Sequence, residues 1–340
     1  MQPHFLRLTS FMSAQDPVFD SSFQTRLLRP RYWPSWLALG ALCLLAFVPP
    51  RWRDKLAEWL APLIVKVSKK QIYIARTNLD ICFADKSDAE RDAILMTSIR
   101  IGLKTLLGFG EFTVRSPAYL MSRIQVSGWE HIEAEQAAGR PVILVVPHSW
   151  PVDAAGYYFT QRGVPMCTMM KSSRNPVFDW HLNRARAKNG CRVYERSAGI
   201  KAVIRTIKGG HSFFYLPDQD HGREKSIFAP FFGYPKATLP ALPRLVQVSG
   251  ARAVPLLACY DEAHYCYRLE IEAPFTDYPS ADLMADTCRM NDMVQQQLTR
   301  HPGQYMWFLK IFDTREDQEG PDGLYEEGIK RIRGDLPPRP

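Results

Sequence analysis

Paired cysteines are missing from this chain. Its seven cysteines are an odd number, none of them forms a CxxC pair, and several lie inside apolar runs, as Cys167 and Cys259 do. This pattern excludes a disulfide framework and a zinc-ligand cluster. It predicts small buried thiols in a reducing compartment, and we expect neither a metal nor a cofactor.

The composition excludes two further classes of protein. Of the 340 residues, 46% are apolar and 23% are charged, which fits neither a mainly disordered chain nor a multi-span membrane protein. Lys and Arg number 43 against 35 Asp and Glu, so the formal net charge is +8. A basic balance suits an anionic partner: nucleic acid, a membrane surface, an acidic carrier protein or a phosphorylated substrate. Nucleic acid is disfavoured because no recognised binding motif is present.

Charge is absent from Trp33 to Pro50. The run is close to the lower limit of about 17 residues for a membrane span, and Trp33, Trp36 and Trp52 lie where an aromatic belt would be. We therefore expect a membrane anchor helix within 31–50, either spanning or half-inserted. A buried core helix is the alternative. A cleaved signal peptide is disfavoured because no small-residue cleavage site follows the run.

The remaining organisation follows from pattern changes along the chain. Residues 1–30 are expected to form a loose arm, 51–120 a helical region, 121–315 an α/β domain, and 316–340 a basic, unstructured tail. Within 56–79 the apolar spacing is helical with Lys and Arg between, which suits either an anionic leaflet or an ordinary surface. Ser87 and Glu90 form a capping box that predicts a helix over 87–110.

From residue 124 short apolar runs alternate with helical stretches, which predicts an α/β fold with a mostly parallel central sheet flanked by helices. The expected strands are 124–127, 142–146, 165–170, 192–194, 212–216, 253–260 and 264–272. The expected helices are 131–138, 152–161, 176–188, 200–208, 239–248 and 282–300. The last two strands should form an antiparallel hairpin, with Tyr265, Tyr267, Leu269 and Ile271 on one face.

His148 and Asp153 form an HX4D pattern. Chance alone gives about one such pair in a chain with eight histidines, so position is what adds weight. His148 follows the most apolar strand, at the edge where open α/β sheets bind ligands. A neutral imidazole there can remove a proton from a hydroxyl, and a carboxylate on its other nitrogen would fix the tautomer. The alternative is that Asp153 only stabilises the start of the next helix.

No GxSxG motif is present, and Ser149 directly follows the histidine, where attack geometry is poor. Direct transfer to a substrate hydroxyl, without a covalent enzyme intermediate, is therefore expected. Nine cations lie between 171 and 205, and they form either a solvated face or a site for phosphates, carboxylates or an oxyanion. Asp218 and Asp220 follow another strand and either position substrate and arginines or form a plain turn.

Several motifs recur in one order in a known family. They are Arg31-Tyr-Trp-Pro34, Pro147-His-Ser-Trp-Pro-Val-Asp153, Asn175-Pro-Val-Phe-Asp179, Tyr215-Leu-Pro-Asp-Gln-Asp-His-Gly222, Lys236-Ala-Thr-Leu-Pro240 and Gln304-Tyr-Met-Trp307. With this set, the chain resembles the late (secondary) acyltransferases of lipid A biosynthesis over about residues 25–315. The residues of these motifs look most like those of the family member that adds the last acyl chain, which is usually myristoyl.

The resemblance implies a glycerol-phosphate acyltransferase-like fold and a defined reaction. A fatty acyl chain would move from acyl carrier protein to a hydroxyl of a hydroxyacyl chain on a Kdo-bearing lipid A precursor. The enzyme would act at the cytoplasmic face of the bacterial inner membrane, among its lipids. His148 would be the general base and Asp153 its orienting partner. Candidates for substrate-anion or oxyanion contacts are Arg186, Arg196 and Arg174, and Asp218 is the candidate supporting acid.

Two other hypotheses remain at this point. A phospholipid acyltransferase would use glycerol-phosphate or lysophosphatidate, but Pro147 precedes the histidine where those enzymes carry Asn, and their Pro-Glu-Gly-Thr block is replaced by Pro-Asp-Gln-Asp. A non-enzymatic protein that binds anionic lipid would not need His148. Acyl length, coenzyme A as the donor and the oligomeric state are not readable from the residues.

Overall fold

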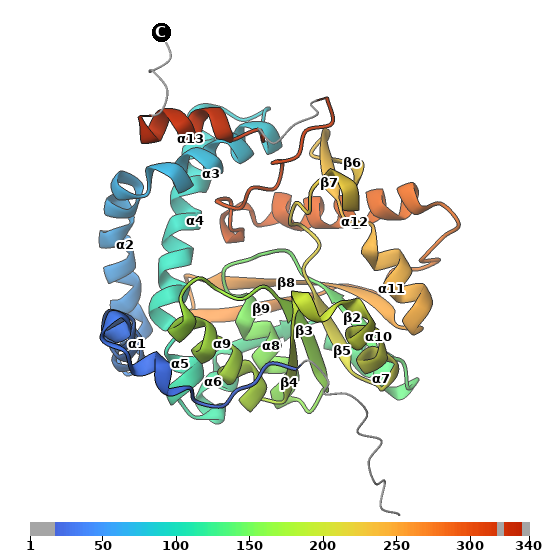
Figure 1. Ribbon diagram of the computed structural model, residues 1–340, viewed down its shortest axis with the longest axis horizontal. Helices are drawn as coiled ribbons and strands as arrows, with labels where there is room; N and C mark the ends of the chain where they lie inside the picture. The colour runs from blue at the N-terminus through green and yellow to red at the C-terminus, as the bar shows by residue number, and fades with distance from the viewer. Residues whose placement is uncertain (1–17, 318–322, 335–340) are drawn as a thin grey trace, which may run out of the picture.

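The computed structural model describes residues 18–317 and 323–334 of the chain, so the predictions for 1–17 of the arm and for 318–322 and 335–340 of the tail lie outside the described residues. At its centre is a seven-stranded sheet of order β1-β9-β8-β2-β5-β3-β4 (Figure 1). The strands are β1 (Ile124–Ser127), β2 (Val142–Val145), β3 (Met166–Met170), β4 (Cys191–Glu195), β5 (Ser212–Tyr215), β8 (Arg252–Asp261) and β9 (Cys266–Ile271).

The sheet is mostly parallel, as predicted. Strands β8, β2, β5, β3 and β4 run in one direction, and β9 pairs with β8 as the antiparallel hairpin. Parallel pairing brings the carboxyl ends of β2, β5, β3 and β4 to one edge of the sheet. Tyr265 departs from the prediction: it lies half-exposed in the hairpin turn with a φ of 55°, while the other three predicted side chains are buried.

Alternate side chains of β2 enter two different cores. Ile143 and Val145 pack with α10 (Ile200–Lys208) and α11 (Ala241–Ser249) on one face, whereas Val142 and Leu144 pack with α7 (Trp129–Ala137) and α8 (Val152–Gln161) on the other. A central parallel strand buried on both faces must be apolar throughout, which is why this run was readable from the sequence. The helices of the domain are α7 (Trp129–Ala137), α8 (Val152–Gln161), α9 (Pro176–Lys188), α10 (Ile200–Lys208), α11 (Ala241–Ser249) and α12 (Leu283–Arg300).

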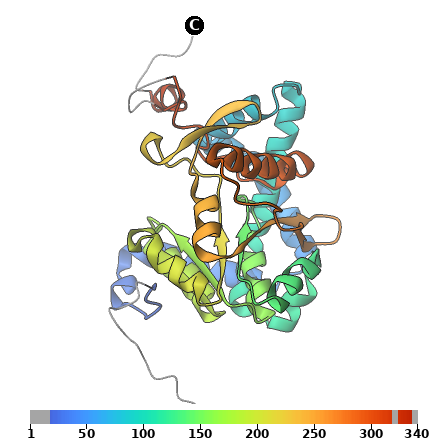
Figure 2. The same cartoon turned by 90° about the vertical axis from the view of Figure 1, so that its right-hand side faces the viewer.

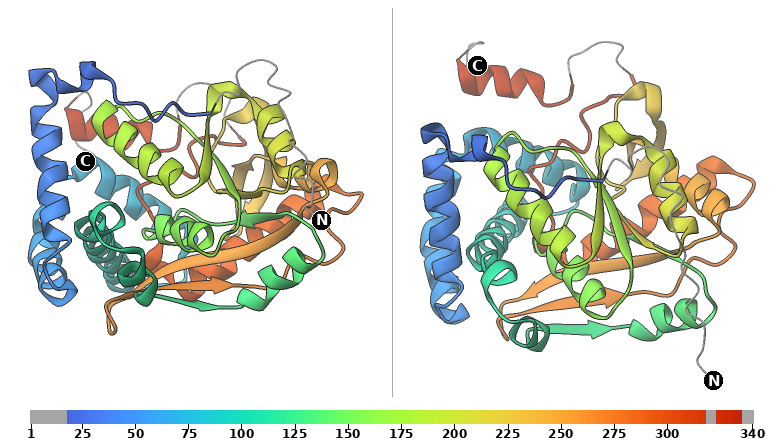
Figure 3. Two further views of the ribbon diagram at one scale, coloured as in Figure 1. Left: turned by 90° about the horizontal axis from the view of Figure 1, so that it is seen from below. Right: turned by 60° about the horizontal axis from the view of Figure 1, so that its bottom comes forward.

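A helical region precedes the sheet and covers one side of it (Figures 1 and 3). It contains α1 (Trp33–Leu45), α2 (Pro50–Val67), α3 (Lys69–Cys82), α4 (Asp88–Gly108), α5 (Glu111–Val114) and α6 (Pro117–Ser122). The Ser87–Glu90 capping box is present: the Ser87 backbone nitrogen donates to Glu90 at 2.8 Å. The single helix pattern over 56–79 is instead broken at Ser68 into α2 and α3.

The helix found within the predicted anchor at 31–50 is shorter than the hydrocarbon core of a bilayer. Helix α1 has 13 residues, about 20 Å at 1.5 Å per residue, against a hydrocarbon core of about 30 Å. Helix α1 ends at Leu45, and Pro49 and Pro50 begin α2 as its N-cap and first residue. The one described helical segment long and apolar enough for a span is Asp88–Val114. Of its apolar 18-residue stretch 44% is buried within the molecule, and the segment carries the buried Lys104.

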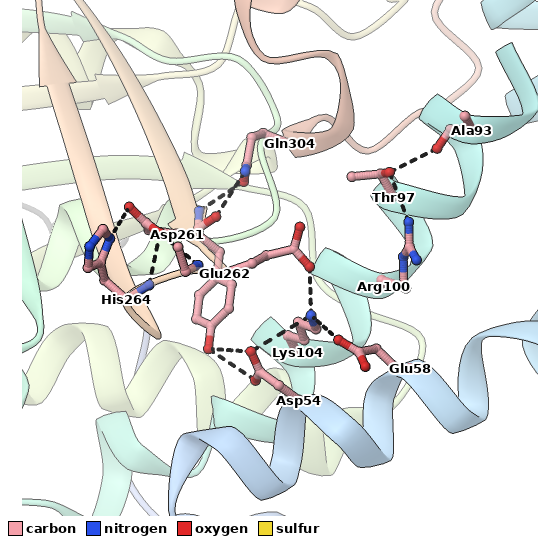
Figure 4. A network of polar contacts seen from close by, with 12 residues as sticks. Asp54, Glu58, Ala93, Thr97, Arg100, Lys104, Asp261, Glu262, His264 and Gln304 are labelled. Carbon is pink, nitrogen blue, oxygen red and sulfur yellow. Dashed lines mark hydrogen bonds and ion pairs between the residues drawn. The ribbon is translucent and has the colours of Figure 1, made fainter. Parts of the chain in front are cut away.

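Helix α2 has an unusual distribution of side chains. Its inward face buries Arg53, which is 3% exposed, and Asp54. Arg53 pairs with Glu111 at 2.6 Å. Lys104 of α4 lies 3.0 Å from Glu58 of α2 and 2.6 Å from Glu262 beyond β8 (Figure 4). Ion pairs therefore hold α2 against the body.

The outward face of α2 is apolar. Trp52, Leu56, Trp59, Leu63 and Val67 are exposed and recur at helical spacing, and Trp59 is 73% exposed. Soluble helices bury their apolar stripe and expose their charges. On α2 the large apolar side chains are exposed, while Arg53 and Asp54 are buried.

One hairpin and one helix were not predicted. Strands β6 (Ile227–Phe231) and β7 (Tyr234–Thr238) form a separate antiparallel hairpin, and α13 (Glu326–Arg333) lies within the predicted unstructured tail. Tyr325 and Ile329 are buried and fix α13 beside α3. Both the hairpin and α13 lie at the top of the molecule in Figures 1 and 2.

Candidate active site

The predicted site residues follow four neighbouring parallel strands. His148 follows β2, Asp218 follows β5, Arg174 follows β3 and Arg196 follows β4. All four loops leave the carboxyl edge of the sheet. This is the place where open α/β sheets bind ligands, because the loops there diverge and helix N-termini point to it.

His148 is held by Asp218. The Asp218 carboxylate accepts one hydrogen bond from the His148 backbone nitrogen at 2.7 Å and another from ring Nδ1 at 2.5 Å. The Asp218 side chain is 2% exposed and that of His148 is 17% exposed. Burial disfavours the charged carboxyl, but the charge and hydrogen bonds of His148, with the nearby Tyr305 hydroxyl, outweigh it and lower the pKa of Asp218. Asp218 is thus a buried carboxylate that fixes the ring.

Asp153 does not make the contact that the HX4D spacing suggested. It lies in the first turn of α8, and its Oδ1 accepts hydrogen bonds from Nε and Nη2 of Arg186 at 2.8 and 2.7 Å. The hydrogen bond to the ring nitrogen of His148 comes from Asp218 instead. The correction is physical: the parallel pairing of β2 with β5 brings Asp218 under the ring, while Asp153 faces α9.

The loop that carries His148 is held from the far end of the chain. The Met306 nitrogen donates to the His148 carbonyl at 3.0 Å, and the Trp150 nitrogen donates to the Gln304 carbonyl at 2.9 Å. The Trp150 indole donates to Ser98 of α4 at 3.0 Å. The Gln304–Trp307 motif therefore has a structural task that its sequence did not reveal, which is to hold the loop of His148 in place.

Gln219 is a site residue that the sequence reasoning did not single out. Its side-chain nitrogen lies 3.2 Å from Nε2 of His148, and its oxygen accepts from Nη2 of Arg196 at 2.9 Å. Its position between Asp218 and Asp220 in a motif was the only available signal. Arg196 is exposed, so this chain of contacts runs from the surface to the buried carboxylate.

The other predicted arginines occupy different settings. Arg186 is paired with Asp153 and points Nη1 at the sulfur of Met170, 3.0 Å away. Arg174 is exposed in the loop between β3 and α9. The structure therefore brings Arg196 to His148 through Gln219, joins Arg186 to Asp153, and leaves Arg174 at the rim.

A buried cation lies behind the site. Lys236 of β7 is 1% exposed, and its Nζ has no hydrogen-bond partner among the described residues. Burial lowers the pKa of Lys236 to about 8, although the charges of Asp218 and Asp220 act to raise it. His221 is close by, and burial together with the charges of Arg196 and Lys236 lowers its pKa to about 4. His221 is therefore neutral at pH 7.

One trio of potential metal ligands lies away from this site within the described ranges. Cys259, Glu270 and His301 stand close together on β8, on β9 and after α12. Arg268 and Arg300 both act on the Cys259 thiol. Two guanidinium groups beside a trio disfavour a cation there, and the trio plays no part in the arrangement around His148.

A family model described as bacterial lipid A biosynthesis acyltransferase matches residues 21–314. Among curated proteins, a lipid A biosynthesis acyltransferase of Haemophilus influenzae is 36% identical over 316 residues, covering 92% of this chain and 96% of that protein. The lipid A biosynthesis myristoyltransferase of Escherichia coli is 36% identical over 303 residues, covering 89% and 93%. The lipid A biosynthesis lauroyltransferase of the same bacterium is 28% identical over 296 residues, covering 87% and 96%.

Proposed function

The chain belongs to the bacterial lipid A biosynthesis acyltransferases and is an acyltransferase enzyme; from that premise we propose its donor, acceptor and mechanism. The donor is an acyl-acyl carrier protein, with myristoyl as the chain, as the name of one relative at 36% identity suggests. The acceptor is a hydroxyl of a hydroxyacyl chain on a Kdo-bearing lipid A precursor. The observation that carries the mechanism is the ring of His148 held by the buried carboxylate of Asp218.

His148 is the general base in this proposal. Its Nε2 takes the proton of the acceptor hydroxyl while the oxygen attacks the thioester carbonyl. The tetrahedral intermediate collapses, the carbon–sulfur bond breaks, and the thiolate of the carrier takes the proton from the imidazolium. The Asp218 carboxylate stabilises that imidazolium through Nδ1. No acyl-enzyme forms, and an ester and a free thiol are the products.

Asp153 acts in this proposal through Arg186. The carboxylate fixes two nitrogens of the guanidinium, and Nη1 is left facing a sulfur rather than an oxygen. A methionine sulfur is a weak acceptor, so that nitrogen is available to a developing oxyanion. Arg196 and Arg174 are candidates for the phosphates and carboxylates of the acceptor, because exposed guanidinium forks match those groups.

The membrane contact is assigned to α1 and α2. These helices lie along one edge of the molecule in Figures 1 and 3. The outward stripe of α2 is apolar, two of its members are tryptophans, and the exposed Arg51, Lys55 and Lys66 stand beside it. Apolar and aromatic groups with flanking cations are the surface of a helix that lies in a bilayer interface. We therefore propose that the enzyme lies on the bilayer rather than crossing it, and we propose the cytoplasmic face of the inner membrane from the family resemblance alone.

Family membership removes the non-enzymatic alternative and makes a lipid A-type acceptor preferable to glycerol-phosphate. The direct test uses purified enzyme, myristoyl-acyl carrier protein and a penta-acylated, Kdo-bearing precursor, with products read by mass spectrometry. One added chain is expected with the wild type, falling on the order of 10²- to 10⁴-fold in His148→Ala. Transfer that survives His148→Ala contradicts the general-base role. Transfer only to a tetra-acylated precursor or to glycerol-phosphate contradicts the acceptor.

A further inference from the structure

The contacts of Gln219 fix the proton positions around His148. A guanidinium group can only donate, so the Gln219 atom facing Arg196 must be the carbonyl oxygen. The amide nitrogen therefore faces Nε2 of His148, at 3.2 Å, and it too can only donate. Nε2 must then be the unprotonated nitrogen, and the ring proton is on Nδ1, where it is donated to Asp218. The network from Arg196 to Asp218 thus selects the basic tautomer of His148.

The same contact occupies the atom that catalysis requires. An unprotonated ring nitrogen has one in-plane lone pair, and here the Gln219 amide already uses it. An acceptor hydroxyl needs that lone pair at about 2.6–3.2 Å before it can lose its proton. The hydroxyl and the amide therefore exclude each other, and Gln219 must move away before transfer.

Only the side chain of Gln219 is free to move. The carboxylate of Asp218 on one side is bonded to His148, and that of Asp220 on the other accepts from the backbone nitrogen and hydroxyl of Thr314 at 2.7 and 2.8 Å. The backbone on both sides is thus fixed, while Gln219 is half-buried and its outer contact, Arg196, is exposed. An anionic group that binds Arg196 competes directly with the carbonyl oxygen of Gln219.

We propose that Gln219 is a place-holding gate: its amide covers Nε2 of His148 until the acceptor hydroxyl, helped by an anion on Arg196, displaces it. This proposal rests on the proposed function of His148 as the general base, and it adds that the base is protected from water until the acceptor binds. While it is closed, water cannot use the base. Otherwise water would add to the thioester carbonyl, its proton would pass to Nε2, the carbon–sulfur bond would break and the thiolate would take that proton. A free fatty acid and a free thiol would be wasted.

The test is donor hydrolysis without acceptor. Full-length wild type, Gln219→Ala and Gln71→Ala are each given myristoyl-acyl carrier protein alone, and free fatty acid and free thiol are followed. Gln71 is an exposed glutamine of α3 and serves as the matched control. We expect hydrolysis to rise about two- to tenfold in Gln219→Ala, the range for losing one neutral hydrogen bond, and to stay unchanged in the control. Adding His148→Ala to Gln219→Ala should abolish the rise.

A second measurement does not depend on turnover. Diethyl pyrocarbonate modifies unprotonated imidazole nitrogens, and its rate at the peptide containing His148 is read by mass spectrometry. The gate predicts faster modification in Gln219→Ala than in wild type and Gln71→Ala. Unchanged hydrolysis and unchanged modification, in an enzyme that still transfers to its acceptor, would overturn the gate and leave the proposed function intact. Loss of transfer to every acceptor by wild type, with faster modification in Gln219→Ala, would overturn the function instead.

Discussion

Asp218 and His148 meet because their strands are in register. Val145, the last residue of β2, pairs with Tyr215, the last residue of β5. Each functional residue lies three positions beyond its strand, so the two loops bring the carboxylate and the ring together at 2.5 Å. The contact is therefore a product of the sheet and spans 70 residues of sequence. This contact gives the two carboxylates different roles. Asp218 of the Pro-Asp-Gln-Asp motif holds the ring of His148, whereas Asp153 of the HX4D motif pairs with Arg186.

The two carboxylates should respond differently to neutralisation. Asp218→Asn removes the charge that stabilises the imidazolium, so kcat should fall on the order of 10²- to 10⁴-fold. Asp153→Asn should act through Arg186, and its loss should not add to that of Arg186→Met, because each change breaks the same ion pair. Initial rates of the two single variants and the double variant measure this. Losses of rate that add up in the Asp153→Asn, Arg186→Met double variant, or an Asp218→Asn variant that is nearly as active as wild type, would contradict these two roles.

Lys236→Met should change how stability depends on pH. Lysine in an unfolded chain has a pKa of about 10.4, and burial lowers the pKa of Lys236 to about 8. Between these values the unfolded state binds more protons, so wild-type stability gains on the order of 3 kcal/mol from Lys236 as the pH rises from 8 to 10.4. Below pH 8 the lysine is charged in both states and contributes no slope.

The difference in thermal midpoint between wild type and Lys236→Met, taken at pH 7, 8, 9 and 10, isolates this contribution. Asp218 stays ionised across this range, so it adds no pH dependence of its own. The difference between the two midpoints should stay constant below pH 8 and should shift in favour of the wild type as the pH rises from 8 to 10. Curves that stay parallel would mean that Lys236 keeps its proton up to its ordinary pKa.

Gly102→Ala should disturb the catalytic loop from α4. A Cβ at this position would lie 2.7 Å from the indole of Trp150, which is also held by Ser98 and packs on Phe308. Overpacking of this kind costs about 1–3 kcal/mol of unfolding free energy, and here it also pushes on the loop of His148. Thermal midpoints and initial rates measure both effects.

The matched control is Gly40→Ala in α1, where a Cβ meets no described atom within 4 Å. That change should raise stability by about 0.5–1 kcal/mol, as alanine does in an open helix position. Trp150→Leu in the Gly102→Ala background should recover part of the lost stability by removing the clash. A Gly102→Ala variant as stable as Gly40→Ala would mean that the indole has room to move.

The outward stripe of α2 should decide membrane binding. Trp59→Glu and Leu63→Glu place charges in the middle of the stripe, so flotation with vesicles of phosphatidylethanolamine and phosphatidylglycerol should fall at least several-fold. Leu283→Glu, at an equally exposed leucine on α12, is the control and should bind as wild type does. Carbonate extraction tests the topology, because an enzyme lying on the bilayer is released and a spanning one is retained.

The sheet was predictable because its central strands are apolar on both faces. The predicted runs for β2 and β8 match the structure within one residue, and the antiparallel hairpin was found through its short turn. The β6–β7 hairpin was missed because Pro230 and Pro235 stand opposite each other within it, and proline argues against a strand. Helix α13 was missed because its composition is that of a charged tail, although the buried Tyr325 and Ile329 and the ion pair of Glu326 with Lys310 hold it to the body.

The site was predictable in its residues and less so in its contacts. His148, Asp153 and Asp218 were all named from their places after strands, yet spacing along the chain suggested the wrong carboxylate as the partner of the ring. The pairing and register of the strands decide which loops meet, and neither can be read directly from the sequence. The length of the helix within the predicted anchor was not readable either: hydropathy measures how apolar a run is, whereas α1 already ends at Leu45 and a new helix starts at Pro50.

The exposed apolar stripe of α2 has a consequence for handling the protein outside the cell. In plain buffer the five exposed apolar residues have no lipid to meet, and water favours covering them with the same stripe of another copy. The apparent oligomeric state will then depend on the medium. We expect assemblies in plain buffer and single copies in detergent or nanodiscs. Light scattering across a detergent series, repeated with Trp59→Glu, distinguishes such clustering from a native oligomer.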